Sequence, residues 1–165
     1  MAYEIEKDWI TKSGLRAIVI IRKSGERRTN RWGYICVPPS HPLHGIGYSE
    51  QADCISQEAV DAEKLGKKSP LLALTATCRS DGEDKVRRSP DVAFDVHGGL
   101  TFSGGKGYPA EGWWLGFDCA HCYDGEIEPD PRWPSFGKVR ELDYVENECE
   151  SLAKQLAEIY EKTES

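Results

Sequence analysis

The segment WWLGFDCAHCYD, residues 113–124, joins a buried-strand pattern to a cluster of metal-ligand side chains. Its first half is apolar and aromatic, and bulky aromatic residues suit a packed, pleated strand. Its last seven residues contain two thiols, an imidazole and two carboxylates. Cys119 and His121 share one face of an extended chain, whereas Cys119 and Cys122 form a CxxC pattern if the chain turns. Either geometry suits a divalent metal, zinc above all, and the alternative is a core strand followed by a polar turn.

Further histidines lie at the ends of two other predicted strands. His41 follows the strand Trp32–Val37, and Pro42 restrains its backbone to an extended conformation. His97 ends an alternating segment, Asp91–His97, that is typical of a half-buried strand. Because one edge of a sheet can gather strand ends, we predict one zinc site with four ligands: His41, His97, Cys119 and His121. Alternative or supporting ligands are Asp118, Cys122, His44 and Asp124.

The fold class follows from the remaining periodicity. Leu15–Arg22 is rich in β-branched residues and is predicted to pair with Trp32–Val37 in a hairpin. The segment Asp143–Lys162 has a single apolar stripe at alternating steps of four and three, which predicts an amphipathic helix. Asp143 and Glu146 have the spacing of a capping box. We therefore expect an α+β fold in which a mostly antiparallel sheet of about five strands packs against this helix.

The chain length predicts one domain over residues 1–165. Within this domain, residues 49–90 lack the regular strand pattern of the flanking sequence, and we predict that they form an insertion. A serine cap, acid in the first turn and a following glycine predict a short surface helix at Ser56–Leu65.

Composition restricts the class of protein. Formal net charge is -7, from 21 basic and 28 acidic residues. This balance argues against direct binding of a nucleic-acid backbone and suits a basic partner surface. The sequence contains neither a membrane-spanning apolar run nor a signal-peptide pattern. We therefore expect a cytoplasmic protein, whose six cysteines are ligands or buried thiols.

Three blocks of sequence carry a resemblance to a known family: GYICVPPSHP (residues 33–42), VHGGLTFS (96–103) and WWLGFDCAH (113–121). In kind and order they resemble the signature of small proteins encoded by phages and prophages. That family is similar to a zinc-containing anti-CRISPR protein that inhibits Cas9. The resemblance singles out His41, His97, Asp118, Cys119 and His121. Cys122 departs from the pattern, which usually has a small residue there, and the 49–90 insertion is longer than expected.

These observations lead to competing functional hypotheses. The resemblance implies a non-enzymatic, phage-derived inhibitor that binds a host defence protein, Cas9 first, in the cytosol of the host cell. A closed site of four protein ligands would favour this hypothesis, because it leaves no position for water. A site with three protein ligands would favour a zinc-dependent hydrolase of a nucleotide or phosphoester, with Asp118, Asp124 or Glu126 as general base. A third hypothesis is nucleotide sequestration in an aromatic pocket formed by Trp113, Trp114 and Trp133.

Overall fold

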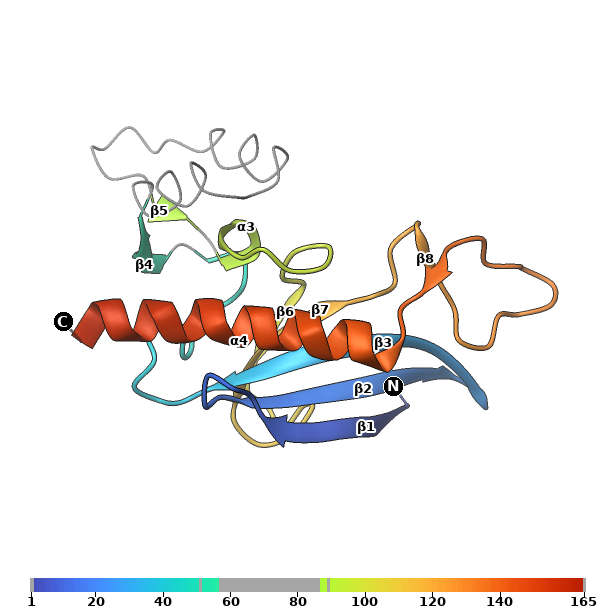
Figure 1. The fold of residues 1–165 in the computed structure, drawn as a ribbon, viewed down its shortest axis with the longest axis horizontal. Coiled ribbons are helices and arrows are strands. Elements are labelled where there is room, and N and C mark those ends of the chain that lie inside the picture. Colours follow the sequence, from blue (N-terminus) through green and yellow to red (C-terminus); the bar gives the residue numbers. More distant parts are fainter. Residues whose placement is uncertain (1, 51, 57–86, 89, 165) are drawn as a thin grey trace.

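The computed structural model describes residues 2–50, 52–56, 87–88 and 90–164. Its centre is an antiparallel sheet of five strands in the order β1-β2-β3-β7-β6 (Figure 1). One long helix, α4 (Leu142–Glu164), lies along one face of this sheet. The strands are β1 (Tyr3–Ile10), β2 (Arg16–Ser24), β3 (Arg27–Val37), β6 (Phe102–Gly104) and β7 (Trp113–Asp118). The predicted α+β fold is confirmed.

The central strands form where the sequence is richest in β-branched residues. Ala17 to Ile21 of β2 are buried, which matches a strand covered on both faces. The turn into β3 uses Gly25, whose φ of 63° lies in the left-handed region that favours glycine. Strand β3 then pairs with β7, and Trp32 lies opposite Asp118. This pairing places the end of β7, and the ligand-type residues that follow it, beside the first half of β3.

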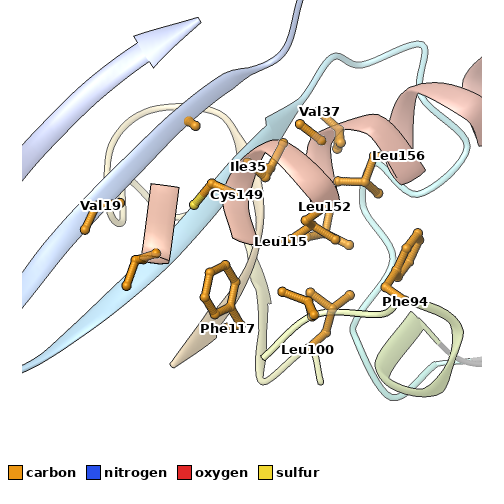
Figure 2. Packing of buried hydrophobic residues seen from close by; sticks show 14 of the residues in the cluster. Val19, Ile35, Val37, Phe94, Leu100, Leu115, Phe117, Cys149, Leu152 and Leu156 are labelled. Atoms are coloured by element: carbon orange, nitrogen blue, oxygen red, sulfur yellow. The ribbon is translucent and has the colours of Figure 1, made fainter. Parts of the chain in front are cut away.

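The main hydrophobic core lies between α4 and the sheet (Figure 2). The buried stripe of the helix includes Val145, Cys149, Leu152 and Leu156, as the heptad-like spacing predicted. Gly33 of β3 permits this close packing, because a Cβ atom there would overlap the ring of Phe117 and the sulfur of Cys149. The helix therefore has a fixed position on the sheet, and its first turns can support a site beyond β7.

A smaller core covers the opposite face of the sheet. It contains Ile18, Ile20, Tyr34 and Trp114, with Tyr108 packed against it. The indole nitrogen of Trp114 donates to the carbonyl of Ala110 at 2.9 Å, and the whole side chain is buried. Trp114 is therefore a core residue, and its predicted role in a binding surface is wrong.

Two segments differ from the sequence-based predictions. Strand β1 was not predicted, because half of its residues are charged and it contains few of the apolar residues that indicate a strand. The strand predicted at Asp91–His97 is wrong: Pro90–Ala93 forms the short helix α3, and an irregular loop follows. Phe94 and Val96 are nevertheless buried in the main core. The alternation of apolar residues therefore arises because an irregular loop, and not a strand, points these two side chains into the core. In this turn the amide of Gly99 donates to the carbonyl of Val96 at 2.9 Å.

Two pairs of short strands lie outside the main sheet. Strands β4 (Ala52–Ser56) and β5 (Arg87–Arg88) are antiparallel, and β8 (Asp124–Gly125) and β9 (Lys138–Val139) are parallel. Most of the predicted 49–90 insertion, including nearly all of the predicted helix Ser56–Leu65, lies outside the described residues. Among the residues described, none of the helices combines the length and apolar character that crossing a bilayer requires.

The buried imidazole of His41 predicts a pH dependence of stability. Burial lowers the pKa of His41, and the carbonyl of Leu156, 2.9 Å from Nε2, only partly offsets this effect. The unfolded chain therefore binds a proton first, near pH 6.5, as pH falls. Stability should be constant above that pH and decline below it, by at most about 1.4 kcal/mol per pH unit from this group.

The measurement is urea unfolding between pH 5 and 7.5. Other groups titrate in this range, so the informative quantity is the difference between the wild type and His41→Asn. We expect a shallower decline for the variant below pH 6.5. Parallel curves for the two proteins would show that His41 does not contribute.

Candidate metal centre

His97 is held by the first turns of α4. Its Nδ1 lies 2.9 Å from the hydroxyl of Tyr144, and its backbone amide donates to Oε2 of Glu148 at 2.7 Å. Tyr144 and Glu148 are four residues apart and therefore neighbours on one helix face. The side chain of His97 is almost fully buried. Helix α4 thus fixes the direction of this imidazole and leaves Nε2 to face the loop after β7.

Asp124 lies between His97 and His121. Its Oδ2 is 2.9 Å from Nε2 of His97 and 3.3 Å from Nδ1 of His121, and it also accepts the backbone amide of His121 at 3.0 Å. Its other oxygen, Oδ1, accepts from Nε of Arg140 at 2.8 Å. A turn closed by the amide of Asp124 and the carbonyl of His121 brings these residues together. The side chain is fully buried, and each of its two carboxylate oxygens accepts at least one hydrogen bond.

This environment keeps the carboxyl of Asp124 ionised. Burial raises its pKa, but the hydrogen bonds from Arg140, His97 and the His121 amide outweigh burial, so that the pKa is below its ordinary value. The bond to Asp124 also raises the pKa of Arg140. Burial raises the pKa of Tyr144, which therefore remains a neutral phenol. The carboxylate of Asp124 is thus surrounded by the guanidinium of Arg140 and by the imidazoles of His97 and His121, each of which has a ring nitrogen near it.

The group His97, His121 and Asp124 can hold a metal ion, because one ligand atom from each lies within 4.8 Å of the others. The candidate ligand atoms are Oδ2 of Asp124 and the imidazole nitrogens that lie beside it, Nε2 of His97 and Nδ1 of His121. Two imidazoles and a carboxylate suit a divalent transition metal. Tyr144 would then accept from Nδ1–H of His97, and Arg140 would fix Asp124, as supporting hydrogen bonds do in metal sites.

A polar cavity of about 240 Å³ opens beside this group. His121 and Asp124 contribute to its wall, together with Asn30 of β3 and Glu126. The loop between β8 and β9 contributes Trp133, Ser135 and Phe136. In Figure 1, β8 and this loop lie near the end of the molecule where α4 begins. A molecule in the cavity would therefore lie against the partly exposed side chain of His121, next to the buried carboxylate of Asp124.

The predicted set of four ligands needs correction, because the structure brings only His97 and His121 together. His41 lies in the core: its Nε2 bonds the Leu156 carbonyl, and its Nδ1 accepts from the amide of Leu43. Cys119 belongs to the main hydrophobic core, where burial and the nearby charges of Asp124 and Asp118 raise its pKa to about 12. Its sulfur is not among the ligand atoms that converge in the described part of the chain.

The alternative residues have different positions. Asp124 is part of the group, and Oδ1 of Asp118 lies 3.9 Å from Nδ1 of His121. Cys122 is exposed at the cavity wall. His44 packs against Trp113, with ring centres 5.7 Å apart. The aromatic pocket predicted from three tryptophans is not formed, because Trp114 is in the smaller core and, of the three, only Trp133 lines the cavity.

Three residues that orient the ligands were not predicted from the sequence: Arg140, Tyr144 and Glu148. Arg140 lies two residues before the start of the last helix, and the other two lie in its first turns. The only sequence signal is the spacing of Tyr144 and Glu148, which places a polar pair on one helix face. No family model matches the chain, and the comparisons found neither a similar curated protein nor a similar solved structure.

Gly98 is required by the position of His121. Its φ is 68°, and a Cβ atom there would overlap the imidazole ring of His121. We expect Gly98→Ala to displace His121 and to weaken binding of a divalent metal at least tenfold, roughly the smallest effect of disturbing a group that orients a metal ligand. Competition with a chromophoric chelator measures this affinity.

The matched control is Gly25→Ala. Gly25 has a similar φ of 63°, but a Cβ atom there would meet nothing within 4 Å. Both variants should lose about 1 kcal/mol or somewhat more of stability from backbone strain. Only Gly98→Ala should lose metal affinity. Equal zinc affinity in the two variants would contradict the position assigned to His121.

Proposed function

We propose that this protein is a zinc-dependent hydrolase whose metal is bound by His97, His121 and Asp124. The observation that carries the proposal is that three ligand atoms, rather than four, converge in the described part of the chain, beside a cavity that His121 and Asp124 help to line. Catalytic zinc typically has three protein ligands and an open position, whereas structural zinc has four protein ligands. The ligand types also suit iron, so metal content must be measured along with activity.

The residues around the cavity have distinct roles in this proposal. A bound zinc ion would lower the pKa of a coordinated water molecule to near neutrality. Glu126 lines the cavity and would serve as the general base. Its Oε2 pairs with Arg27 at 3.2 Å, whereas its Oε1 has no partner among the described residues. Tyr144 and Arg140 keep His97 and Asp124 in position.

A turnover assay with the zinc-loaded protein tests the proposal. The substrates are a panel of nucleosides, nucleotides and phosphoesters. His121→Ala should abolish activity, and Glu126→Gln should reduce kcat by about 10²–10⁴-fold, the typical contribution of a general base. Glu128→Gln is the matched control, because Glu128 pairs with Arg28 and does not line the cavity. Activity that survives metal removal would refute the proposal.

The family resemblance supports a different proposal, an inhibitor of a bacterial immune nuclease with Cas9 as the first candidate. The acidic net charge of -7 is compatible with competition for a basic surface. The same preparation should therefore be added to a Cas9 DNA-cleavage assay. Inhibition that saturates near equimolar protein, without turnover of any small substrate, would replace the hydrolase with the inhibitor.

A further inference from the structure

The cavity beside the metal group has an aromatic rim. Trp133 is 79% exposed and Phe136 is 95% exposed, and both line the cavity from the loop between β8 and β9. Single exposed aromatic residues are common, but two on the rim of one cavity form a surface on which a flat ring can stack. The amide of Trp133 donates to the carbonyl of Asp130 at 3.0 Å, which helps to order this part of the loop.

The cavity also presents hydrogen-bond acceptors. Asn30 donates through Nδ2 to the carbonyls of Cys119, at 2.8 Å, and Gly125, at 3.2 Å. These two bonds fix the amide plane, and Oδ1 of Asn30 accepts no hydrogen bond from the described residues. Oε1 of Glu126 is likewise without a partner in that part of the chain. An acceptor that is fixed but unused favours a ligand with N–H donors at the matching place.

The charges around the cavity argue against a bound phosphate. Two acidic residues, Asp124 and Glu126, contribute to the wall, although the carboxylate of Asp124 is fully buried and paired with Arg140. The described residues of the wall include neither lysine nor arginine. The nearest guanidinium groups are already used, since Arg140 bonds Asp124 and Arg27 bonds Glu126. Apart from a bound metal ion, the described wall therefore offers a phosphate group none of the cationic side chains that usually bind it.

We infer that the cavity binds a planar heterocyclic base that carries an exocyclic amino group. The ring stacks on Trp133 and Phe136, and the amino group donates to Oδ1 of Asn30 or Oε1 of Glu126. This inference deepens the proposed function, on which it rests for the nearness of the base to a metal. The recognition itself depends only on the cavity wall.

Calorimetric titration of the zinc-loaded protein with matched nucleosides tests the inference. Adenosine and inosine differ in an amino group that is replaced by a carbonyl oxygen, as do cytidine and uridine. In at least one pair, we expect the nucleoside with the amino group to bind at least tenfold more tightly than its partner. The carbonyl oxygen of the partner cannot donate a hydrogen bond to the acceptors of the cavity. In the metal-free protein, adenosine monophosphate should bind no more tightly than adenosine. Equal affinities within both pairs, or preference for the phosphate in the metal-free protein, would overturn the inference.

Two variants separate stacking from hydrogen bonding. Trp133→Ala should weaken both members of the preferred pair by about 5–100-fold, the usual contribution of one aromatic stack. Asn30→Ala should instead reduce the difference in affinity between the nucleoside with the amino group and the nucleoside with the carbonyl oxygen. Tyr48→Ala is the control for the loss of an exposed aromatic residue, since Tyr48 does not line the cavity. If Tyr48→Ala weakens binding as much as Trp133→Ala, the assigned site is wrong.

Analysis of the recovered nucleosides distinguishes this inference from the proposed hydrolase. Amino-selective binding without chemical conversion supports the inference and removes the hydrolase, leaving a protein that sequesters the base. Conversion of substrates without any preference for the amino group supports the hydrolase and overturns the inference.

Discussion

Asp124→Ala should abolish zinc binding and lower the free energy of unfolding of the metal-free protein by about 3–5 kcal/mol, the usual effect of removing one member of a buried ion pair. The carboxylate is fully buried and accepts from Arg140 and from the backbone amide of His121. It also lies 2.9 Å from Nε2 of His97. Removing it leaves the guanidinium and the imidazole without their partner. Urea unfolding with a chelator present measures the stability, and calorimetry measures zinc binding.

The matched control is Asp118→Ala, six residues away in the same segment. Asp118 is partly exposed and accepts a hydrogen bond from the amide of Ala120 at 3.1 Å. We expect this variant to retain zinc binding and to lose about 1 kcal/mol or less. Similar losses of zinc binding and of stability in the two variants would show that the negative charge of this segment, and not the buried hydrogen-bond network of Asp124, is what the site requires.

Zinc should raise the melting temperature of the wild type but not that of His121→Ala. At a free zinc concentration 100 times Kd, binding stabilises the folded state by about 2.7 kcal/mol. For a chain of this size that corresponds to a shift of roughly 5–10 °C. The imidazole of His121 is 26% exposed, so its removal should affect the metal-free protein much less than removal of Asp124.

Cys122→Ser provides the control for this shift. Cys122 is exposed at the cavity wall and adjoins His121, but it is outside the group of converging ligand atoms. The variant should keep the full zinc-dependent shift. A shift that disappears in Cys122→Ser, or persists in His121→Ala, would contradict the ligand set.

The fold was predictable where the determining pattern is local. The β-branched run in β2 and the apolar stripe of α4 depend on neighbouring residues, and both predictions are confirmed. The segment 91–97 was mistaken for a strand because Phe94 and Val96 alternate as strand residues do. A turning loop under α4 buries the same side chains, and only the tertiary fold distinguishes the two arrangements.

The candidate site was predictable only in part. His97 and His121 were identified because each follows a segment of packed apolar residues. Cys119 was misassigned because the chain was taken to remain extended after β7, whereas it buries the thiol in the core and then turns. That turn places Asp124 between the two imidazoles. The contacts of Tyr144, Glu148 and Arg140 with the site depend on how α4 packs on the sheet, which local sequence does not encode.

X-ray absorption at the zinc edge tests the central claim most directly, because it identifies the atoms around the metal. The protein should bind one zinc ion per chain, coordinated only by nitrogen and oxygen at about 2.0–2.2 Å. His97→Ala and His121→Ala should each remove the imidazole signal together with stoichiometric binding. A sulfur neighbour at about 2.3 Å, or a protein that does not retain stoichiometric zinc, would contradict the three-ligand centre.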